Sequence, residues 1–245
     1  MNLNVLWYKT QGIRPLCLYH FPCTDGFTAW WAVHKAFDGE VDGFPIDYKD
    51  PIPEECAGRH VICVDFCPDQ EKLDPLVAMV QHLVILDHHP RSASALKNFK
   101  ERGENKKVMV EFDLKRSGAG ITWDYFHDTQ RPTIVNYAED RDLWRKALPH
   151  SEEFTAFLGA HPFTLNNWYH LANTKPEDIV TIGDVLLRKR KLDVESIAEQ
   201  TATLITVDGK TIPIMNCQHS LSSDACHHLL KLHPKAPYAL SYHIQ

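Results

Sequence analysis

The chain of 245 residues is predicted to be an α/β protein: a doubly wound, mostly parallel sheet, then a helical linker and a small α+β lobe. Two observations carry this prediction. Short apolar runs alternate with helix-length segments through the N-terminal part, which is the pattern of successive βα units. Past Trp144 the pattern changes to long helical stretches, and Asp208-Gly209 then gives a hairpin signal.

The elements of the first part are expected in a simple alternation. The runs 60–65 and 82–87 are rich in Val, Ile and Leu without polar interruption, which is typical of strands buried in a parallel sheet. Asp69 is expected to cap the helix that it opens. In chain order we expect strands at 15–20, 41–47, 60–65, 82–87 and 107–113, and helices at 25–37, 69–80, 92–100, 117–127 and 133–140.

The second part is expected to be helical before it returns to strands. We expect helices at 151–161, 165–173 and 176–201, a hairpin of strands 204–207 and 210–216, a helix at 220–232 and a strand at 238–244. The basic run 188–191 is interpreted as a solvated helix face rather than a phosphate-binding patch. The predicted domains are residues 1–150, a helical linker at 151–201 and a partial substrate-binding lobe at 202–245.

The composition restricts the class of substrate and the cellular compartment that we expect for this protein. The net charge of −6 argues against a protein that coats long nucleic acid, and leaves a small anionic substrate open. The seven cysteines include no Cys-x-x-Cys pair, which favours reduced thiols in a cytoplasmic protein. Residues 1–9 lack a basic segment followed by a long apolar one, so we expect no signal peptide there, and no apolar stretch approaches the ~20 residues of a membrane span.

Metal-type ligands follow several predicted strands. Asp87, His88 and His89 end the apolar run 82–87, and open α/β sheets bind ligands beyond the carboxyl ends of their strands. Carboxylates with one or two imidazoles suit Mn²⁺ or Mg²⁺. Each group has a structural alternative, such as a cap, a turn or a core histidine, but their repetition at successive strand ends favours a metal cluster. The other members are His20, Asp25, Asp65 and the group 139–142, which we expect in a polar turn.

Four segments resemble the motifs of the DHH phosphoesterase superfamily, in the same order: residues 20–26, 64–66, 87–89 and 140–144. Ser117-Gly118-Ala119-Gly120 is also similar to this family, and the resemblance covers about residues 15–150. The family includes RecJ-type exonucleases, hydrolases of short oligoribonucleotides and cyclic dinucleotides, and some pyrophosphatases, and typically uses two Mn²⁺ ions.

The resemblance also implies roles for single residues. Asp65 would bridge the two ions, His20 would bind one, and Asp25, His88 and Asp140 would bind the other. His89 would hold or polarise the scissile phosphate, with Asp87 orienting a neighbouring imidazole. Arg141 and Ser117 are weaker candidates for substrate binding, Arg141 being more typical of a surface ion pair.

The chain departs from the family at two places. Cys23 stands where the first motif commonly has an acid, and a thiol is a poor ligand for Mn²⁺. The chain has no Gly-Gly pair, although many members carry a Gly-rich loop in a second domain, and Gln245 falls inside an expected strand. The chain is therefore either a fragment or a short variant, and an unpaired strand edge would need covering, for example in a homodimer.

The leading hypothesis is a Mn²⁺-dependent phosphoesterase, with Mg²⁺ as the alternative ion. A metal-activated water would hydrolyse phosphodiester bonds in short oligonucleotides or cyclic dinucleotides. A pyrophosphatase-like hydrolase and a degenerate nucleotide-binding module stay open as alternatives. Four tryptophans are interpreted as core residues rather than base-stacking platforms: Trp30, Trp31, Trp123 and Trp168.

Overall fold

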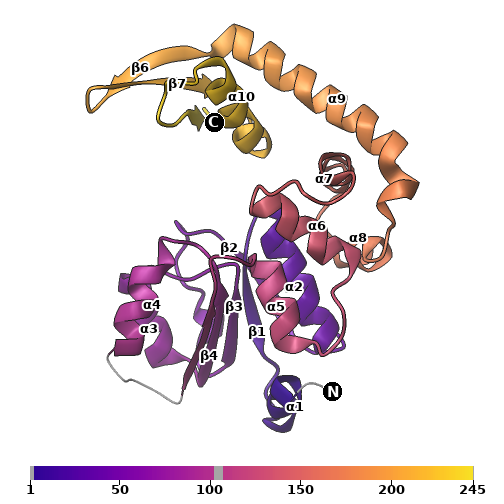
Figure 1. Ribbon diagram of the computed structural model, residues 1–245. Helices are drawn as coiled ribbons and strands as arrows, with labels where there is room; N and C mark the ends of the chain where they lie inside the picture. Colours follow the sequence, from indigo (N-terminus) through magenta and orange to yellow (C-terminus); the bar gives the residue numbers. More distant parts are fainter. Residues whose placement is uncertain (1–2, 102–106, 245) are drawn as a thin grey trace. The chain divides into compact units, whose positions relative to one another are not determined.

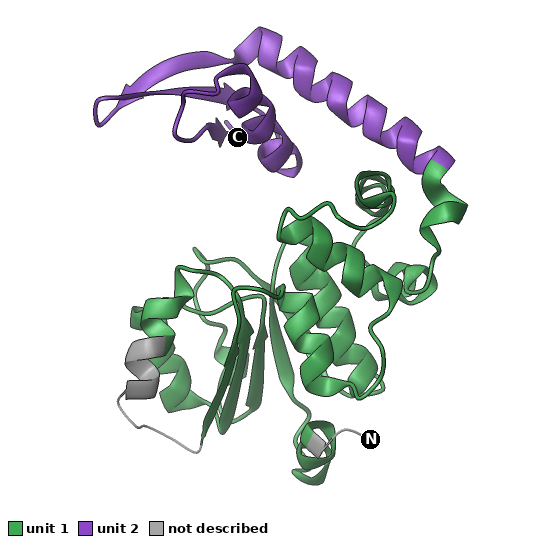
Figure 2. Cartoon of the chain, in the orientation of Figure 1, with its two compact units in different colours: residues 1–180 green, residues 181–245 purple. Residues whose placement is uncertain are grey.

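The protein is described by a computed structural model over residues 3–101 and 107–244. Two compact units divide the chain, residues 1–180 and residues 181–245 (Figure 2). The first contains a five-stranded parallel sheet, and the second contains a small three-stranded mixed sheet. The predicted α/β fold class is thereby confirmed.

The sheet of the first unit has the strand order β2-β1-β3-β4-β5, with every neighbouring pair parallel. All five residues of β3 are buried, which agrees with the uninterrupted apolar run that predicted it. The edge strand β2 contains Pro45, whose missing N–H is tolerated at a sheet edge. The bounds are β1 (Leu16–His20), β2 (Asp42–Ile46), β3 (His60–Val64), β4 (His82–Asp87) and β5 (Val108–Phe112).

Helices cover both faces of this sheet (Figure 1). On one face α2 (Thr24–Ala36) and α5 (Gly118–Phe126) pack against Cys17, Ile62 and Val84. On the other face α3 (Gln70–Met79) and α4 (Ser92–Glu101) pack against the alternate strand residues, such as Leu18 and Cys63. Successive strand residues therefore feed two separate cores, as the doubly wound arrangement requires.

The helices that follow the sheet extend the first of these cores. Phe154, Leu158 and Ile179 join it, and the four tryptophans of the sequence analysis are all buried in it. This burial agrees with their interpretation as core residues. The bounds are α6 (Thr133–Asp142), α7 (Ser151–Gly159), α8 (Leu165–Leu171) and α9 (Pro176–Thr201), the last crossing into the second unit.

Two short helices and one cap differ from the sequence analysis. We predicted no helix at α1 (Leu3–Thr10), where Val5 and Tyr8 are buried, nor at the short 3-10 helix η1 (Glu54–Cys56). Asp69 precedes α3 but does not cap it, because its carboxylate accepts a hydrogen bond from Arg91 Nη2 at 2.8 Å instead.

The second unit has a small core of its own. Strands β6 (Thr203–Val207) and β7 (Lys210–Asn216) form the predicted hairpin, with Asp208 and Gly209 both at positive φ. Strand β8 (Leu240–Tyr242) pairs parallel to β7, after η2 (His219–Leu221) and α10 (Ser222–Leu232). Coverage of this sheet by a partner subunit stays a prediction. The core residues are Ala198, Met215, Cys217, Ala225 and Leu229.

The basic run of the sequence analysis lies on α9, where its side chains form ion pairs. Arg188 pairs with Asp184 at 3.1 Å, and Arg190 pairs with Asp224 at 2.5 Å. These contacts agree with the interpretation of this run as a helix face. Within residues 3–101 and 107–244, no helix combines the length and apolar character needed to cross a bilayer.

Candidate metal centre

Three adjacent strands bring their carboxyl ends together at one edge of the sheet. His20 is the last residue of β1, Asp65 follows β3, and Asp87 is the last residue of β4. The strand order reverses between β1 and β3, because β2 lies on one side and β3 to β5 on the other. Such a switch point opens a crevice at the strand ends, where ligands of α/β folds bind.

Asp65 lies at the centre of the cluster and is 1% exposed. Its Oδ1 lies 3.2 Å from His88 Nε2 and 3.7 Å from His89 Nδ1, and its Oδ2 lies 3.4 Å from His20 Nδ1. The backbone of Asp65 has a φ of 52°, a left-handed conformation that Asp tolerates better than most residues. One carboxylate therefore faces three imidazoles at the place where we predicted a bridging ligand.

Asp25 reaches the same cluster from the first turn of α2. Its Oδ1 accepts a hydrogen bond from Ala119 N at 3.2 Å, at the start of α5, and its Oδ2 lies 3.9 Å from His88 Nε2. The helix can start so close to β1 only because residue 26 is glycine. A Cβ on Gly26 would lie 2.1 Å from the carbonyl oxygen of His20.

Of the group 139–142, Asp140 contacts the chain that follows α6, whereas Asp142 lies beside His88. Residues 139–142 form the last turn of α6, not the polar turn that we expected. The buried Asp140 carboxylate accepts hydrogen bonds from Ala147 N at 3.0 Å and from Ser151 Oγ, so it fixes the chain that follows the helix. Asp142 Oδ2 instead lies 3.4 Å from His88 Nε2.

The Asp87–His89 pair lies beside the central carboxylate. His89 Nδ1 is 2.8 Å from Asp87 Oδ1, and Asp87 is fully buried, while the His89 side chain is 27% exposed. Burial alone would lower the pKa of His89, but Asp87 and Asp65 raise it to about 9. The two carboxylates therefore favour the protonated form of His89 in the ion-free chain.

The carboxylates of the cluster repel one another. Burial, followed by the charges of Asp65 and Asp142, raises the pKa of Asp25 well above its usual value. Burial and the charge of Asp65 raise the pKa of Asp142 to about 6. Burial would also raise the pKa of Asp65, but the three neighbouring imidazoles outweigh it and lower that pKa. The cluster therefore has an excess of negative charge that a cation would offset.

The two weaker candidates are Ser117 and Arg141, whose role in substrate binding stays a prediction. Ser117 is fully buried, and its Oγ accepts the N–H of Gly120 as the N-cap of α5. The Arg141 guanidinium lies 4.0 Å from the ring centre of Trp144. A side-chain hydrogen bond from Ser117 also counters the rise in the pKa of Asp25, so Ser117 supports both the start of α5 and a candidate ligand.

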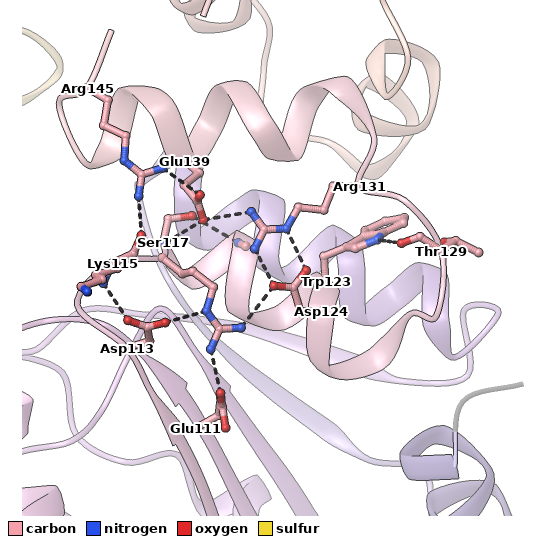
Figure 3. A network of polar contacts seen from close by, with 12 residues as sticks. Glu111, Asp113, Lys115, Ser117, Trp123, Asp124, Thr129, Arg131, Glu139 and Arg145 are labelled. Carbon is pink, nitrogen blue, oxygen red and sulfur yellow. Dashed lines mark hydrogen bonds and ion pairs between the residues drawn. The ribbon is translucent and has the colours of Figure 1, made fainter. Parts of the chain in front are cut away.

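A network of ion pairs and hydrogen bonds joins α5 and α6 (Figure 3). Glu139 Oε2 accepts the N–H of Ser117 at 3.1 Å and lies 3.1 Å from Arg131 Nη1. Arg131 also binds Asp124, and Arg145 Nη1 donates to Glu139 Oε1 at 3.0 Å. Because Asp25 and Asp142 depend on these two helix ends, the network fixes the spacing of the candidate ligands.

The sequence analysis did not predict that the ring of Tyr48 forms a wall beside the cluster. The ring of Tyr48, which follows β2, lies 5.3 Å from the ring of His20 and 5.9 Å from that of His89. The Arg91 guanidinium lies over the Tyr48 ring, 3.8 Å from the ring centre. The only sequence signal was the place of Arg91 just after His89-Pro90.

Among the residues that the structure describes, three groups of side chains have the donor atoms and spacing to hold a metal ion, each with its ligand atoms within 4.8 Å of one another. Asp65 belongs to two of these groups and His88 to two. The groups are His20 with Cys23 and Asp65, Asp65 with His88 and His89, and Asp25 with His88 and Asp142.

No protein-family model matches the chain. An uncharacterized protein of Acanthamoeba polyphaga mimivirus is 25% identical over 236 residues, which cover 87% of this chain and 53% of that protein. The chain thus spans about half the length of this curated relative.

Among solved structures, the exonuclease RecJ bound to manganese superposes with a TM-score of 0.51 at 12% identity, over 98% of this chain and 78% of that one. A pGpG-specific phosphodiesterase, PggH from Vibrio, gives a TM-score of 0.43 at 10% identity, over 95% and 78% of the two chains. The protein therefore shares the fold of this RecJ structure, and the relation of its four motifs to the DHH superfamily stays a prediction.

Proposed function

We propose that this protein is a phosphoesterase that depends on a divalent metal ion and hydrolyses phosphodiester bonds in short oligonucleotides or cyclic dinucleotides. The observation that carries the proposal is the meeting of Asp25, Asp65, His88 and Asp142 at the switch point of the fold shared with RecJ. The proposal also transfers to this chain the manganese of the RecJ structure and the nucleotide substrate of PggH.

The residues fit a hard divalent cation. Asp25 Oδ2 and Asp65 Oδ2 are buried and have no hydrogen-bond partner in the part of the chain that the structure describes. Buried charged oxygens without partners are costly, and a cation removes that cost. Asp25, His88 and Asp142 would hold Mn²⁺ or Mg²⁺ through two carboxylates and one imidazole.

The remaining groups of the site fit an anionic substrate. A bound divalent ion supplies charge for a phosphate oxygen and lowers the pKa of water. Asp87 keeps His89 protonated and oriented, so that its second ring N–H is available to a phosphate oxygen. The net charge of −6 disfavours long nucleic acid and supports a small substrate.

The experiment incubates the full chain and Mn²⁺ with a linear dinucleotide, a five-residue RNA, a cyclic dinucleotide and pyrophosphate. We expect turnover of at least one nucleotide and its loss in His88→Ala and Asp65→Asn. His170→Ala, an exposed histidine on α8, is the matched control and should keep full activity. Turnover that survives both site substitutions would refute the assignment. Hydrolysis of pyrophosphate alone would favour the phosphoanhydride alternative, and tight nucleotide binding without turnover would favour a binding module.

A further inference from the structure

Cys23 brings a sulfur atom to the cluster. It lies between β1 and α2, in the N-cap position of α2, and its thiol belongs to the group with His20 and Asp65. The three donor atoms, one sulfur, one ring nitrogen and one carboxylate oxygen, lie within 4.8 Å of one another. This donor set differs in kind from the set of Asp25, His88 and Asp142.

The nitrogen and oxygen atoms of this group are buried and face one another. Apart from that mutual contact, Asp65 Oδ2 and His20 Nδ1 form no hydrogen bond with any described residue. They lie 3.4 Å apart. Ligands of a tetrahedral zinc ion, at about 2.0–2.3 Å from the metal, lie about 3.3–3.8 Å from each other. The existing separation therefore suits a small divalent ion without rearrangement of these two side chains.

The identity of the ligands decides which ion fits. Thiolates bind Zn²⁺ and other soft or borderline ions far better than they bind Mn²⁺ or Mg²⁺, and nitrogen–sulfur sites follow an affinity series in which Mn²⁺ is the weakest. An acid in place of Cys23 would make this set as hard as the other one. The sulfur therefore makes the two donor sets unlike.

We infer that the chain has two metal sites of different selectivity, with His20, Cys23 and Asp65 holding Zn²⁺ and Asp25, His88 and Asp142 holding Mn²⁺ or Mg²⁺. When Zn²⁺ binds, the Cys23 thiol releases its proton to solvent and the sulfur coordinates as the thiolate. The inference rests on the proposed function, because Asp65 belongs to the first set and its Oδ1 lies 3.2 Å from His88 Nε2 of the second.

The test uses Co²⁺ as a spectroscopic substitute for Zn²⁺ on the metal-free full chain, without substrate. A cobalt ion bound to a thiolate gives a sulfur-to-metal charge-transfer band in the near ultraviolet. We expect this band in the unaltered chain, its displacement by Zn²⁺ but not by Mn²⁺, and its loss in Cys23→Ser. Cys226→Ser removes another half-buried free thiol, in the second unit, and should leave the band intact.

Competition titrations give the selectivity. We expect Cys23→Ser to weaken Zn²⁺ binding at least about tenfold, and Cys23→Asp to move the preference of this site towards Mn²⁺. A second readout needs no variant and measures the alkylation of Cys23 by mass spectrometry. Zn²⁺ should slow this alkylation, whereas Mn²⁺ should not.

Absence of the cobalt–thiolate band, its persistence in Cys23→Ser, or equal protection of Cys23 by Mn²⁺ and Zn²⁺ would overturn the inference. If Mn²⁺ still binds and Asp142→Asn abolishes that binding, only the sulfur site fails. If no divalent ion binds at all, the proposed function fails with it.

Discussion

Asp140 and Asp142 offer a direct test of the site, because the same change at both positions should have opposite effects. Asp140→Asn removes one of two acceptor oxygens that bind Ala147 N, Leu148 N and Ser151 Oγ. A hydrogen bond to a charged group contributes about 1.5–3 kcal/mol, so the free energy of unfolding should fall by about 2–3 kcal/mol. For a chain of this size the melting temperature should drop by about 4–12 °C.

Asp142→Asn should leave stability intact or raise it. The pKa of Asp142 is raised from 3.8 to about 6, so its charge destabilises the ion-free chain. At 1.36 kcal/mol per pKa unit the full shift would be about 3 kcal/mol. The side chain is 27% exposed, and solvent screening reduces the expected gain to about 1 kcal/mol. Loss of a ligand should weaken Mn²⁺ binding by about tenfold to a hundredfold or more.

The assay pairs urea unfolding in the presence of a chelator with calorimetric titration of Mn²⁺ into the same two variants. Asp140→Asn should lose stability and keep its ion stoichiometry. Asp142→Asn should keep or gain stability and bind Mn²⁺ more weakly. The reasoning is refuted if Asp140→Asn loses the ion at unchanged stability while Asp142→Asn binds it normally.

The other predictions concern pH, close packing and the ion-pair network. Because the folded-state pKa of Asp142 lies above the unfolded value, the stabilising protonation is present at low pH and lost as the pH rises through about 6. The ion-free chain should thus gain stability from pH 7 to pH 5 in chelator-treated urea melts, and Asp142→Asn should lack that gain. In Gly118→Ala the new Cβ would lie 2.5 Å from Asp65 Cβ, so thermal melts should show a loss of about 1–3 kcal/mol with weaker Mn²⁺ binding. Gly159→Ala, with open space around the new Cβ, should instead gain up to about 1 kcal/mol. Glu139→Gln should cost about 1–3 kcal/mol in urea melts without changing the number of ions bound, and unchanged stability would contradict the role given to the network.

The sheet was predictable because its central strands are short, uninterrupted apolar runs. Runs such as 60–64 and 82–87 are buried on both faces, so no polar residue interrupts them, and Pro or a turn residue ends them. The short helix α1 was missed, although Val5 and Tyr8, three residues apart and both buried, carried its signal.

The strand-end ligands were predictable for the same reason, since parallel strands deliver their carboxyl ends to one edge. The choice between Asp140 and Asp142 was not predictable, because a sequence does not reveal where α6 ends. Two residues apart on a helix, Asp140 and Asp142 point in nearly opposite directions. Only the position of the helix end decides which carboxylate joins His88. The wall of Tyr48 and Arg91 depends on tertiary packing that no local pattern encodes.

The candidate ligands are spread along the first unit, from His20 on β1 to Asp142 at the end of α6. Loops of that length close late and slowly during folding, so the cluster exists only once the last helix has docked on the sheet. An ion bound there would stabilise the fully assembled unit alone, by about 2.7 kcal/mol at a hundredfold excess over its dissociation constant. Metal supply would then govern the lifetime of the folded chain against proteolysis, apart from any catalysis.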